Sequence, residues 1–322
     1  MTTRVDAAGA AAVLARHREV TVLCHLRPDA DALGSATGLT RALRAAGAVV
    51  HPSFDPGEVP AGLRAIPGTG DVLPLADVPA HEGLVVVLDC ASEDRVGDWG
   101  RLAAEADEIL VVDHHRSNPG FGTHLLLDPG AASTATLVTE ILDAGGYPLD
   151  PETATSLYAG LVTDTGSFRW GGPGAHDTAR RLLAAGAEAG ALGFELLDAH
   201  PFDWLAVLGG LLAAARLEPD AAGGRGVVWL EVPHRIAGTA PQEDVESLVS
   251  HLRGVREAAV AVLLKEYRPG EWSVSLRSRD GDAVDVAAVA GALGGGGHPA
   301  AAGCTVGGDA LGIVARIREL LA

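Results

Sequence analysis

Leu84-Val85-Val86-Val87-Leu88-Asp89 is a run of five apolar residues that ends in a carboxylate. Similar runs cover residues 20–24 and 109–112, and each of these is also followed by His or Asp. Short runs of continuous hydrophobicity are typical of strands buried on both faces of a parallel sheet. In such sheets ligands lie beyond the carboxyl ends of the strands, which is where the polar residues fall.

Helical segments separate these strands along the chain. Residues 32–46 have helical character between two strands, and residues 133–144 and 152–162 follow as helices, the second with Pro151 at its start. Two further strands are expected at residues 49–52 and 124–127. The alternation predicts an α/β domain with a parallel sheet covered by helices on both faces.

The pattern changes after this part of the chain. Residues 178–186 and 191–217 look helical, and we interpret the second stretch as a connector. Strands are then expected at residues 227–232, 259–266, 271–277 and 301–306, and helices at 283–293 and 309–321. The sequence therefore predicts a first domain at 1–188, a helical connector at 189–217 and a smaller α/β domain at 218–322.

Composition excludes several classes of protein. The formal net charge of -18 argues against wrapping of duplex DNA, which depends on many Lys and Arg contacts to phosphate. No stretch is apolar enough for a membrane span. The three cysteines, Cys24, Cys90 and Cys304, offer no disulfide framework, so a soluble protein of the cytoplasm is expected. Lys265 is the single lysine, so phosphate contacts are expected from arginine.

Six candidate metal ligands recur at strand ends or in the helices next to them. Each alone has a plain structural reading, since Asp29 is a good helix N-cap and Asp89 could cap a turn. Together they indicate one site, and carboxylate and imidazole without thiolate suit Mn²⁺ better than structural zinc. The six residues are His25, Asp29, Asp31, Asp89, His114 and Asp164.

Three further features support this reading. In Asp113-His114-His115 one histidine can bind metal while the next faces substrate, and Asp113 can orient an imidazole. Gly34 is expected to let its helix pack closely on the sheet. The run Gly294-Gly295-Gly296-Gly297-His298 is either a flexible loop or a backbone cradle for phosphate, with Arg277 near the same ligand. The other histidines, His81 among them, read as surface or packing residues.

With these motifs in this order, the sequence resembles the DHH phosphoesterase superfamily over nearly its whole length. It is most similar to two-domain members in which a DHH-associated domain carries the GGGGH motif, the group of bifunctional oligoribonucleases and 3'-phosphoadenosine 5'-phosphate (pAp) phosphatases. That group also includes enzymes that act on linear or cyclic dinucleotides. RecJ exonucleases are longer, and manganese pyrophosphatases have a different second domain.

The resemblance implies two metal ions, with Mn²⁺ favoured and Mg²⁺ or Co²⁺ as alternatives. His25, Asp29 and Asp89 would bind one ion, and Asp89 would bridge to a second ion held also by Asp31, His114 and Asp164. Catalytic roles would belong to Asp89, Asp113 and His115, with His115 at the scissile phosphate and a water between the ions as nucleophile. The implied substrate contacts are Arg277, Gly295, Gly296, Gly297 and His298, with Arg116, Asn118 and Arg169 as further candidates.

Three functions remain open at this point. The leading hypothesis is hydrolysis of very short RNAs such as pApA, together with pAp. A cyclic di-AMP or other cyclic dinucleotide phosphodiesterase is the second, and a nucleotide-sensing module without turnover is the third. The complete ligand set speaks against the sensor. The assembly state also remains open, with a homodimer as one alternative.

Overall fold

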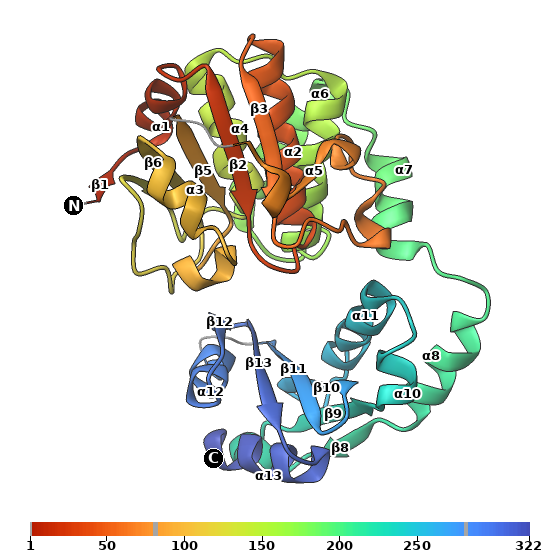
Figure 1. The fold of residues 1–322 in the computed structure, drawn as a ribbon. Helices are drawn as coiled ribbons and strands as arrows, with labels where there is room; N and C mark the ends of the chain where they lie inside the picture. The colour runs from red at the N-terminus through yellow and green to blue at the C-terminus, as the bar shows by residue number, and fades with distance from the viewer. Residues whose placement is uncertain (1, 80–82, 280–282) are drawn as a thin grey trace. The chain divides into compact units, whose positions relative to one another are not determined.

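The computed structural model describes residues 2–79, 83–279 and 283–322, so the interpretation of His81 lies outside the described residues. The chain divides into two compact units, Met1–Ala199 and His200–Ala322, each of which has its own sheet (Figure 1). No helix among these residues is both long and apolar enough to cross a membrane.

The first unit is built on a sheet of seven parallel strands in the order β1-β7-β6-β5-β2-β3-β4. The strands are β1 (Thr3–Arg4), β2 (Glu19–Cys24), β3 (Val49–Phe54), β4 (Leu73–Pro74), β5 (Leu84–Leu88), β6 (Glu108–Asp113) and β7 (His124–Leu127). The fold class predicted from the sequence is therefore confirmed.

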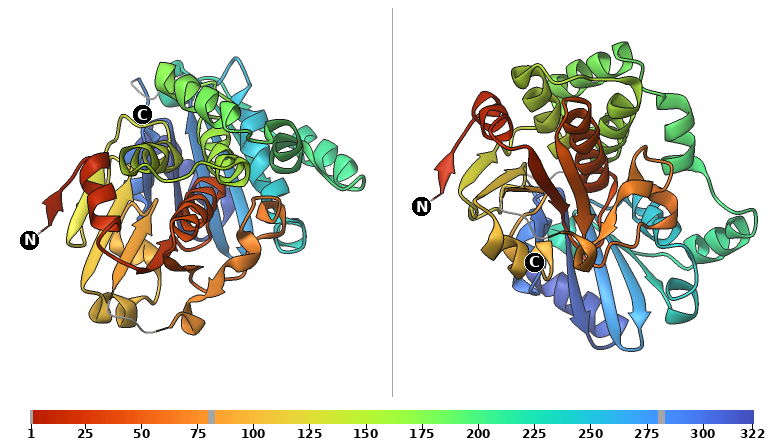
Figure 2. Two further views of the ribbon diagram at one scale, coloured as in Figure 1. Left: turned by 90° about the horizontal axis from the view of Figure 1, so that it is seen from above. Right: turned by 45° about the horizontal axis from the view of Figure 1, so that its top comes forward.

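Helices of the first unit cover both faces of this sheet. They are α1 (Ala7–Leu14), α2 (Ala30–Ala45), α3 (Gly100–Glu105), α4 (Thr134–Gly145), α5 (Pro151–Asp164), α6 (Gly172–Ala184) and α7 (Ala189–Gly193), which a π-helix continues (Phe194–Asp198). Figure 2 shows the red helix α2 close to the olive and green helices of the same face. Single turns of 3-10 helix lie at Ala61–Leu63, Thr69–Asp71, Leu75–Asp77 and Glu93–Val96.

The continuous hydrophobicity of the strands follows from this double cover. Within β5, Val86 packs into the core beneath α2, α4 and α5, whereas Val85 and Val87 pack into the core on the other face, with Trp99 and Leu102. Successive side chains of a strand point to opposite faces, so every position of a strand buried on both faces must be apolar.

Helices α2 and α5 pack against each other unusually closely. A Cβ at Gly34 would lie 2.3 Å from the Ser156 carbonyl oxygen on α5, and one at Gly38 would lie 2.8 Å from Leu157. We expected Gly34 to let α2 pack closely on the sheet. That expectation is wrong, because the element that Gly34 contacts closely is helix α5. This contact brings Asp31 of α2 next to Gly160 of α5.

The second unit has a mixed six-stranded sheet in the order β12-β13-β11-β10-β9-β8, in which only β9 and β10 pair in parallel. The strands are β8 (Arg216–Glu218), β9 (Val227–Val232), β10 (Val260–Arg268), β11 (Glu271–Ser278), β12 (Gly296–His298) and β13 (Ala301–Gly307). The helices are α8 (Trp204–Ala213), α9 (Ala221–Gly224), α10 (His234–Ala237), α11 (Gln242–Arg253), α12 (Val286–Ala292) and α13 (Ala310–Leu320).

Several elements of this part differ from the sequence prediction, among them β8, α9, α10, α11 and β12, none of which was predicted. The stretch 191–217 is not one helix, because an extended segment with Ala199 at ψ 116° precedes Pro201 and residues 216–218 form strand β8. Helix α11 was not predicted. Its signal is apolar spacing at Val245, Leu248, Val249 and Leu252, all of which are buried.

Candidate metal centre

The candidate ligands occupy one end of the first unit's sheet. His25 follows β2, Asp89 follows β5, and His114 follows β6, and these three strands are neighbours in the sheet. Asp29 caps α2 by accepting hydrogen bonds from the N–H groups of Asp31 and Ala32, both at 3.0 Å. The capping role and the site role of Asp29 therefore coexist.

His25, Asp29 and Asp89 form a first group. Their ligand-type atoms all lie within 4.8 Å of one another. His25 Nε2 is 3.6 Å from Asp89 Oδ2 and 3.9 Å from Asp29 Oδ2. An imidazole nitrogen and two carboxylate oxygens thus face one common point.

Asp31, His114 and Asp164 form a second group within the same limit of 4.8 Å. His114 Nε2 lies 3.1 Å from Asp164 Oδ2, 4.0 Å from Asp31 Oδ2 and 3.7 Å from Asp89 Oδ1. Asp89 therefore presents one oxygen to each group, as a bridging carboxylate does. All six side chains singled out from the sequence are brought together.

The start of helix α4 supports two of these carboxylates. The N–H groups of Thr134 and Ala135 donate to the two oxygens of Asp31 at 2.7 and 2.9 Å, and Thr134 Oγ1 donates to Asp89 Oδ1 at 2.9 Å. A carboxylate at a helix N-terminus is favoured by the helix dipole and by the free N–H groups. Sequence reasoning missed Thr134, whose one local signal is its place after the N-cap Ser133.

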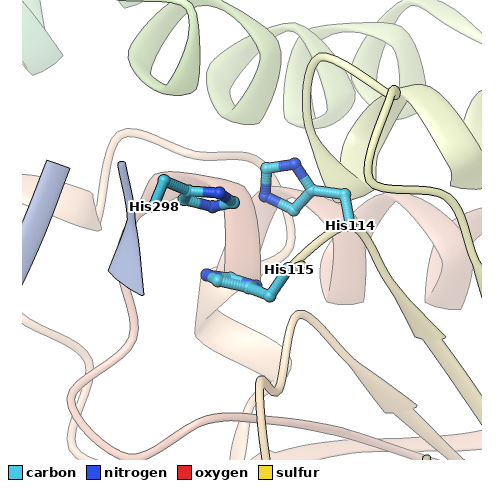
Figure 3. A group of neighbouring side chains, drawn as sticks. All are labelled: His114, His115 and His298. Atoms are coloured by element: carbon cyan, nitrogen blue, oxygen red, sulfur yellow. The ribbon is translucent and has the colours of Figure 1, made fainter. Parts of the chain in front are cut away.

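Asp113 holds the second histidine of the motif. His115 Nδ1 lies 2.7 Å from Asp113 Oδ1, and Asn118 Nδ2 donates to Asp113 Oδ2 at 2.7 Å. The rings of His114 and His115 meet edge to face with centroids 4.9 Å apart (Figure 3). Burial by itself lowers the pKa of His115, but the hydrogen bond to Asp113 and the charges of Asp89 and Asp113 together raise that pKa.

Asn118 faces the protein interior. Its amide donates also to the Cys90 carbonyl at 3.0 Å and accepts from the Gly120 N–H at 2.8 Å. The side chain is buried, and these bonds suit a role in positioning Asp113 better than a direct contact to substrate. Arg116 and Arg169 are exposed.

Backbone groups orient the other imidazole. His25 Nδ1 lies 2.8 Å from the Leu26 carbonyl, which as an acceptor requires Nδ1 to carry the hydrogen and leaves Nε2 for the first group. Arg95 Nη2 lies 3.3 Å from the same ring nitrogen, a neighbour that sequence reasoning missed. Asp89 has φ +59°, a strained value of the kind that clusters at functional sites.

The electrostatics of the two groups favour cations. Burial by itself lowers the pKa of His25 and of His114, yet contacts with Asp89 and Asp164 outweigh it and raise these pKa values to about 9 and about 11. Burial and then the charge of Asp89 raise the pKa of Asp31 well above its usual value. The cluster thus holds excess negative charge, which divalent cations would neutralise.

In the second unit, Arg277 and His298 come close together through the sheet. Arg277 on β11 and His298 on β12 both pair with Ala301 of β13. Part of the glycine run, Gly296–His298, forms the edge strand β12, which pairs with β13. A Cβ at Gly295 would lie 2.1 Å from the Gly303 carbonyl, and one at Gly297 would lie 2.5 Å from the Ala301 carbonyl. These two glycines are therefore required by the approach of β13.

Comparison with known proteins identifies two domains in this chain. Residues 19–161 match the DHH family, N-terminal domain, and residues 231–321 match the DHHA1 domain. The bifunctional oligoribonuclease and PAP phosphatase NrnA of Thermus thermophilus is 33% identical over 291 residues, 89% of this chain and 84% of the relative. The cyclic-di-AMP phosphodiesterase GdpP of Bacillus subtilis is 28% identical, over 55% of this chain and 29% of the relative.

A solved structure shows the same fold. The exopolyphosphatase-related protein from Bacteroides fragilis superposes with a TM-score of 0.86 at 22% sequence identity, covering 98% of this chain and 95% of that one. At this identity the likeness concerns the fold alone.

Proposed function

The chain belongs to the DHH family of phosphoesterases, and on this basis we propose that it hydrolyses very short oligoribonucleotides, such as pApA, to mononucleotides and pAp to AMP. The observation that carries the proposal is the meeting of six ligand-type side chains in two groups that share Asp89. The similarity to the oligoribonuclease and PAP phosphatase of Thermus thermophilus, which spans both domains, supports this substrate class.

Two divalent cations fit the two groups. His25, Asp29 and Asp89 would hold one ion, and Asp31, Asp89, His114 and Asp164 the other. Oxygen and imidazole donors suit Mn²⁺, with Mg²⁺ and Co²⁺ as alternatives. When bound, such ions polarise phosphoryl oxygens and lower the pKa of an attacking water.

The protein's own groups would orient the substrate and move protons. Asp113 engages His115 Nδ1, which leaves Nε2 as the ring nitrogen that faces the scissile phosphate. Because Asp113 holds the ring through Nδ1, a proton on Nε2 could pass to the leaving oxygen. Asn118 fixes Asp113 through the second carboxylate oxygen.

Nucleotide binding is assigned to the second unit in this proposal. Arg277 and His298, which flank Ala301, would contact phosphate or base, and the backbone of residues 295–297 would approach the substrate closely. Arg116 and Arg169 are further candidates for phosphate contacts.

The proposal also covers the size of the substrate, the location of the protein and its oligomeric state. The net charge of -18 supports small substrates over duplex DNA. The three free cysteines, all buried, support a cytoplasmic location. We expect the enzyme to act without binding a membrane, and the proposal fits either a monomer or a homodimer.

A substrate panel tests the proposal directly. Purified protein with Mn²⁺ should hydrolyse pApA and pAp faster than cyclic di-AMP and pyrophosphate, and elemental analysis should find two Mn²⁺ per chain. His115→Ala, which leaves both ligand groups intact, should keep the metal and lose most of the activity. Absence of hydrolysis of any nucleotide by metal-loaded protein would contradict the proposal.

A cyclic di-AMP phosphodiesterase is the second candidate. It is favoured by the similarity to GdpP, but that similarity covers only 55% of this chain. Faster turnover of cyclic di-AMP than of pApA in the panel would select it.

A further inference from the structure

Lys265 of strand β10 is a buried cation in a chain that otherwise uses arginine. The sequence has 24 basic residues of the Lys and Arg types, and Lys265 is the only lysine among them. It is 1% exposed. A buried charge is costly unless it is paired and hydrogen-bonded, so the groups that surround this ammonium indicate what it serves.

Lys265 holds a carboxylate of helix α11 in place. Its Nζ donates to Glu246 Oε1, and it also donates to Ser275 Oγ at 2.8 Å. Ser275 Oγ in turn donates to Glu246 Oε2 at 3.3 Å. Both oxygens of Glu246 are thus fixed from the protein side, yet its side chain remains 37% exposed. The carboxylate is therefore immobilised and can still be reached from solvent.

The register of the second sheet places Ser275 on the same face as Arg277. One position of β11 separates the two residues, so their side chains point the same way and stand about 7 Å apart. Arg277 pairs with Ala301 of β13, and Ser275 pairs with Gly303, which in turn pairs with Gly296 of β12. Neither glycine is buried. Beside Ser275 the sheet therefore presents bare backbone, which leaves room for a ligand.

The other face of these strands is filled by a core. Val274 and Leu276, on either side of Ser275 in β11, pack there with residues of α12 and α13. Ser275 instead faces α11, which carries Glu246. The immobilised carboxylate and Arg277 thus share the face that the core leaves accessible.

A carboxylate beside an arginine that contacts phosphate suits a hydroxyl donor of the substrate. An ionised carboxylate only accepts hydrogen bonds, and it has capacity for further bonds beyond those from Lys265 and Ser275. In pAp and in the first nucleotide of pApA, the 3' oxygen carries phosphate. The ribose donor that both substrates share is therefore the 2'-hydroxyl, a group that carboxylates also bind in dinucleotide-binding folds.

We propose that Glu246 accepts a hydrogen bond from the 2'-hydroxyl of the nucleotide that Arg277 contacts, an inference that rests on the proposed function. Glu246 thereby selects ribonucleotides over deoxyribonucleotides, since the 2'-hydroxyl is the group that distinguishes them. Lys265 and Ser275 are positioning residues. The buried ammonium also offsets the charge of the carboxylate, which would otherwise repel a phosphate nearby.

The test compares pApA with the matched deoxyribose dinucleotide pdApdA. The wild type should prefer pApA in kcat/KM by about tenfold or more, as expected for a hydrogen bond to a charged group. Glu246→Gln, which keeps the shape and weakens the acceptor, should reduce this preference by lowering kcat/KM for pApA alone. Glu231→Gln is the matched control and should keep the full preference, because exposed Glu231 pairs with Leu264 on the opposite face of the sheet.

A double variant guards against simple loss of the fold. Glu246→Leu combined with Lys265→Met replaces the ion pair by apolar side chains of similar size, a change that often leaves stability unaltered. Urea denaturation should show a folded protein, and elemental analysis should find the metal content of the wild type. The preference for pApA over pdApdA should nevertheless disappear.

Three results would overturn the inference. Equal turnover of the two dinucleotides by the wild type would mean that no group reads the 2'-hydroxyl, and a preference that persists in the double variant would mean that another group reads it. Equal losses on both substrates would mean that Glu246 and Lys265 only secure α11 to the sheet.

Isothermal titration with AMP and 2'-deoxy-AMP separates this inference from the proposed function, because it needs no turnover. Tighter binding of AMP by the Mn²⁺-loaded wild type, lost in the double variant, supports recognition of the 2'-hydroxyl even if pApA is not hydrolysed. Equal binding of the two nucleotides, or binding of neither, contradicts it.

Discussion

Among single residues, Thr134 connects the two candidate ligand groups through its hydrogen bonds. Its N–H binds Asp31 and its hydroxyl binds Asp89, so one residue fixes carboxylates from two different elements. Outer hydrogen bonds of this kind hold metal-binding side chains in position and are commonly worth about ten- to a hundredfold in metal affinity.

Thr134→Val should therefore weaken Mn²⁺ binding by about tenfold or more, because it removes the hydroxyl without changing side-chain volume much. Isothermal titration measures the affinity. Thr139→Val, in the same helix and equally buried, loses only a bond to the Ala135 carbonyl and should bind Mn²⁺ as the wild type does. Equal affinities in the two variants would contradict the role of the Thr134 hydroxyl.

Asp89→Ala should be the most damaging single ligand change, because its two oxygens face different histidines, His25 and His114. We expect loss of bound metal and a fall in kcat of more than about a hundredfold, the range seen when a group that stabilises transition-state charge is removed. Asp29→Ala, which touches only the first group, should retain more metal. Near wild-type turnover by Asp89→Ala would show that the shared carboxylate is not needed.

At the scale of elements, the contact between α2 and α5 decides the spacing of the second ligand group, since these helices carry Asp31 and Asp164. Gly34→Ala should push the helices apart and cost about 1–3 kcal/mol in unfolding free energy, the usual range for overpacking. Gly174→Ala, in α6 with open space around it, should instead stabilise by up to about 1 kcal/mol. Urea denaturation measures both, and a neutral Gly34→Ala would contradict the close contact.

Glu108 links the end of the α1 segment to strands β6 and β7. Arg16 bonds both of its oxygens at 2.8 Å, and His17 and His124 contact it at 2.7 and 3.0 Å. Chiefly the Arg16 hydrogen bonds lower the pKa of Glu108 from 4.5 to about 2. Because the folded-state pKa is depressed, the stabilisation is present above about pH 4.5 and is lost as pH falls toward 2.

The stability difference between wild type and Glu108→Gln should therefore be largest above pH 4.5 and shrink as pH falls toward 2. Urea denaturation over this pH range measures it. Glu105→Gln, in a surface pair with Arg101, should show only a small difference at every pH. A Glu108→Gln difference that stays constant with pH would rule out this linkage.

At the scale of the whole molecule, charge bears on substrate length. Because the protein has a net charge of -18, a long RNA would meet repulsion outside the proposed metal centre, whereas a dinucleotide would contact the metal-loaded centre alone. We expect kcat/KM to fall steeply from a dinucleotide to a 24-mer RNA, with mononucleotides released one at a time. Equal values for the two lengths, or products cut internally, would favour an open groove such as that of a longer exonuclease.

The sequence by itself determined the sheet and the set of candidate ligands. Strand runs buried on both faces are apolar at most positions, and five of the six candidate ligands lie at the end of such a run or at the start of the next helix, so this part of the pattern is visible locally. This is why His25, Asp89 and His114 could be predicted to meet. Asp164 is the exception among the six, because it ends helix α5, which follows another helix. Helix α11 was equally visible in its spacing, but it was overlooked.

Only the tertiary structure decided what surrounds these ligands. Thr134 and Asp31 are 103 residues apart, and Arg95 and His25 are 70 apart, so no local pattern announces either contact. Gly34 shows the same limit: its need for space was evident, but its partner on α5 was not. Trp170 shows it too: it is 41% exposed while the other four tryptophans are buried, because burial is decided only when distant segments pack together.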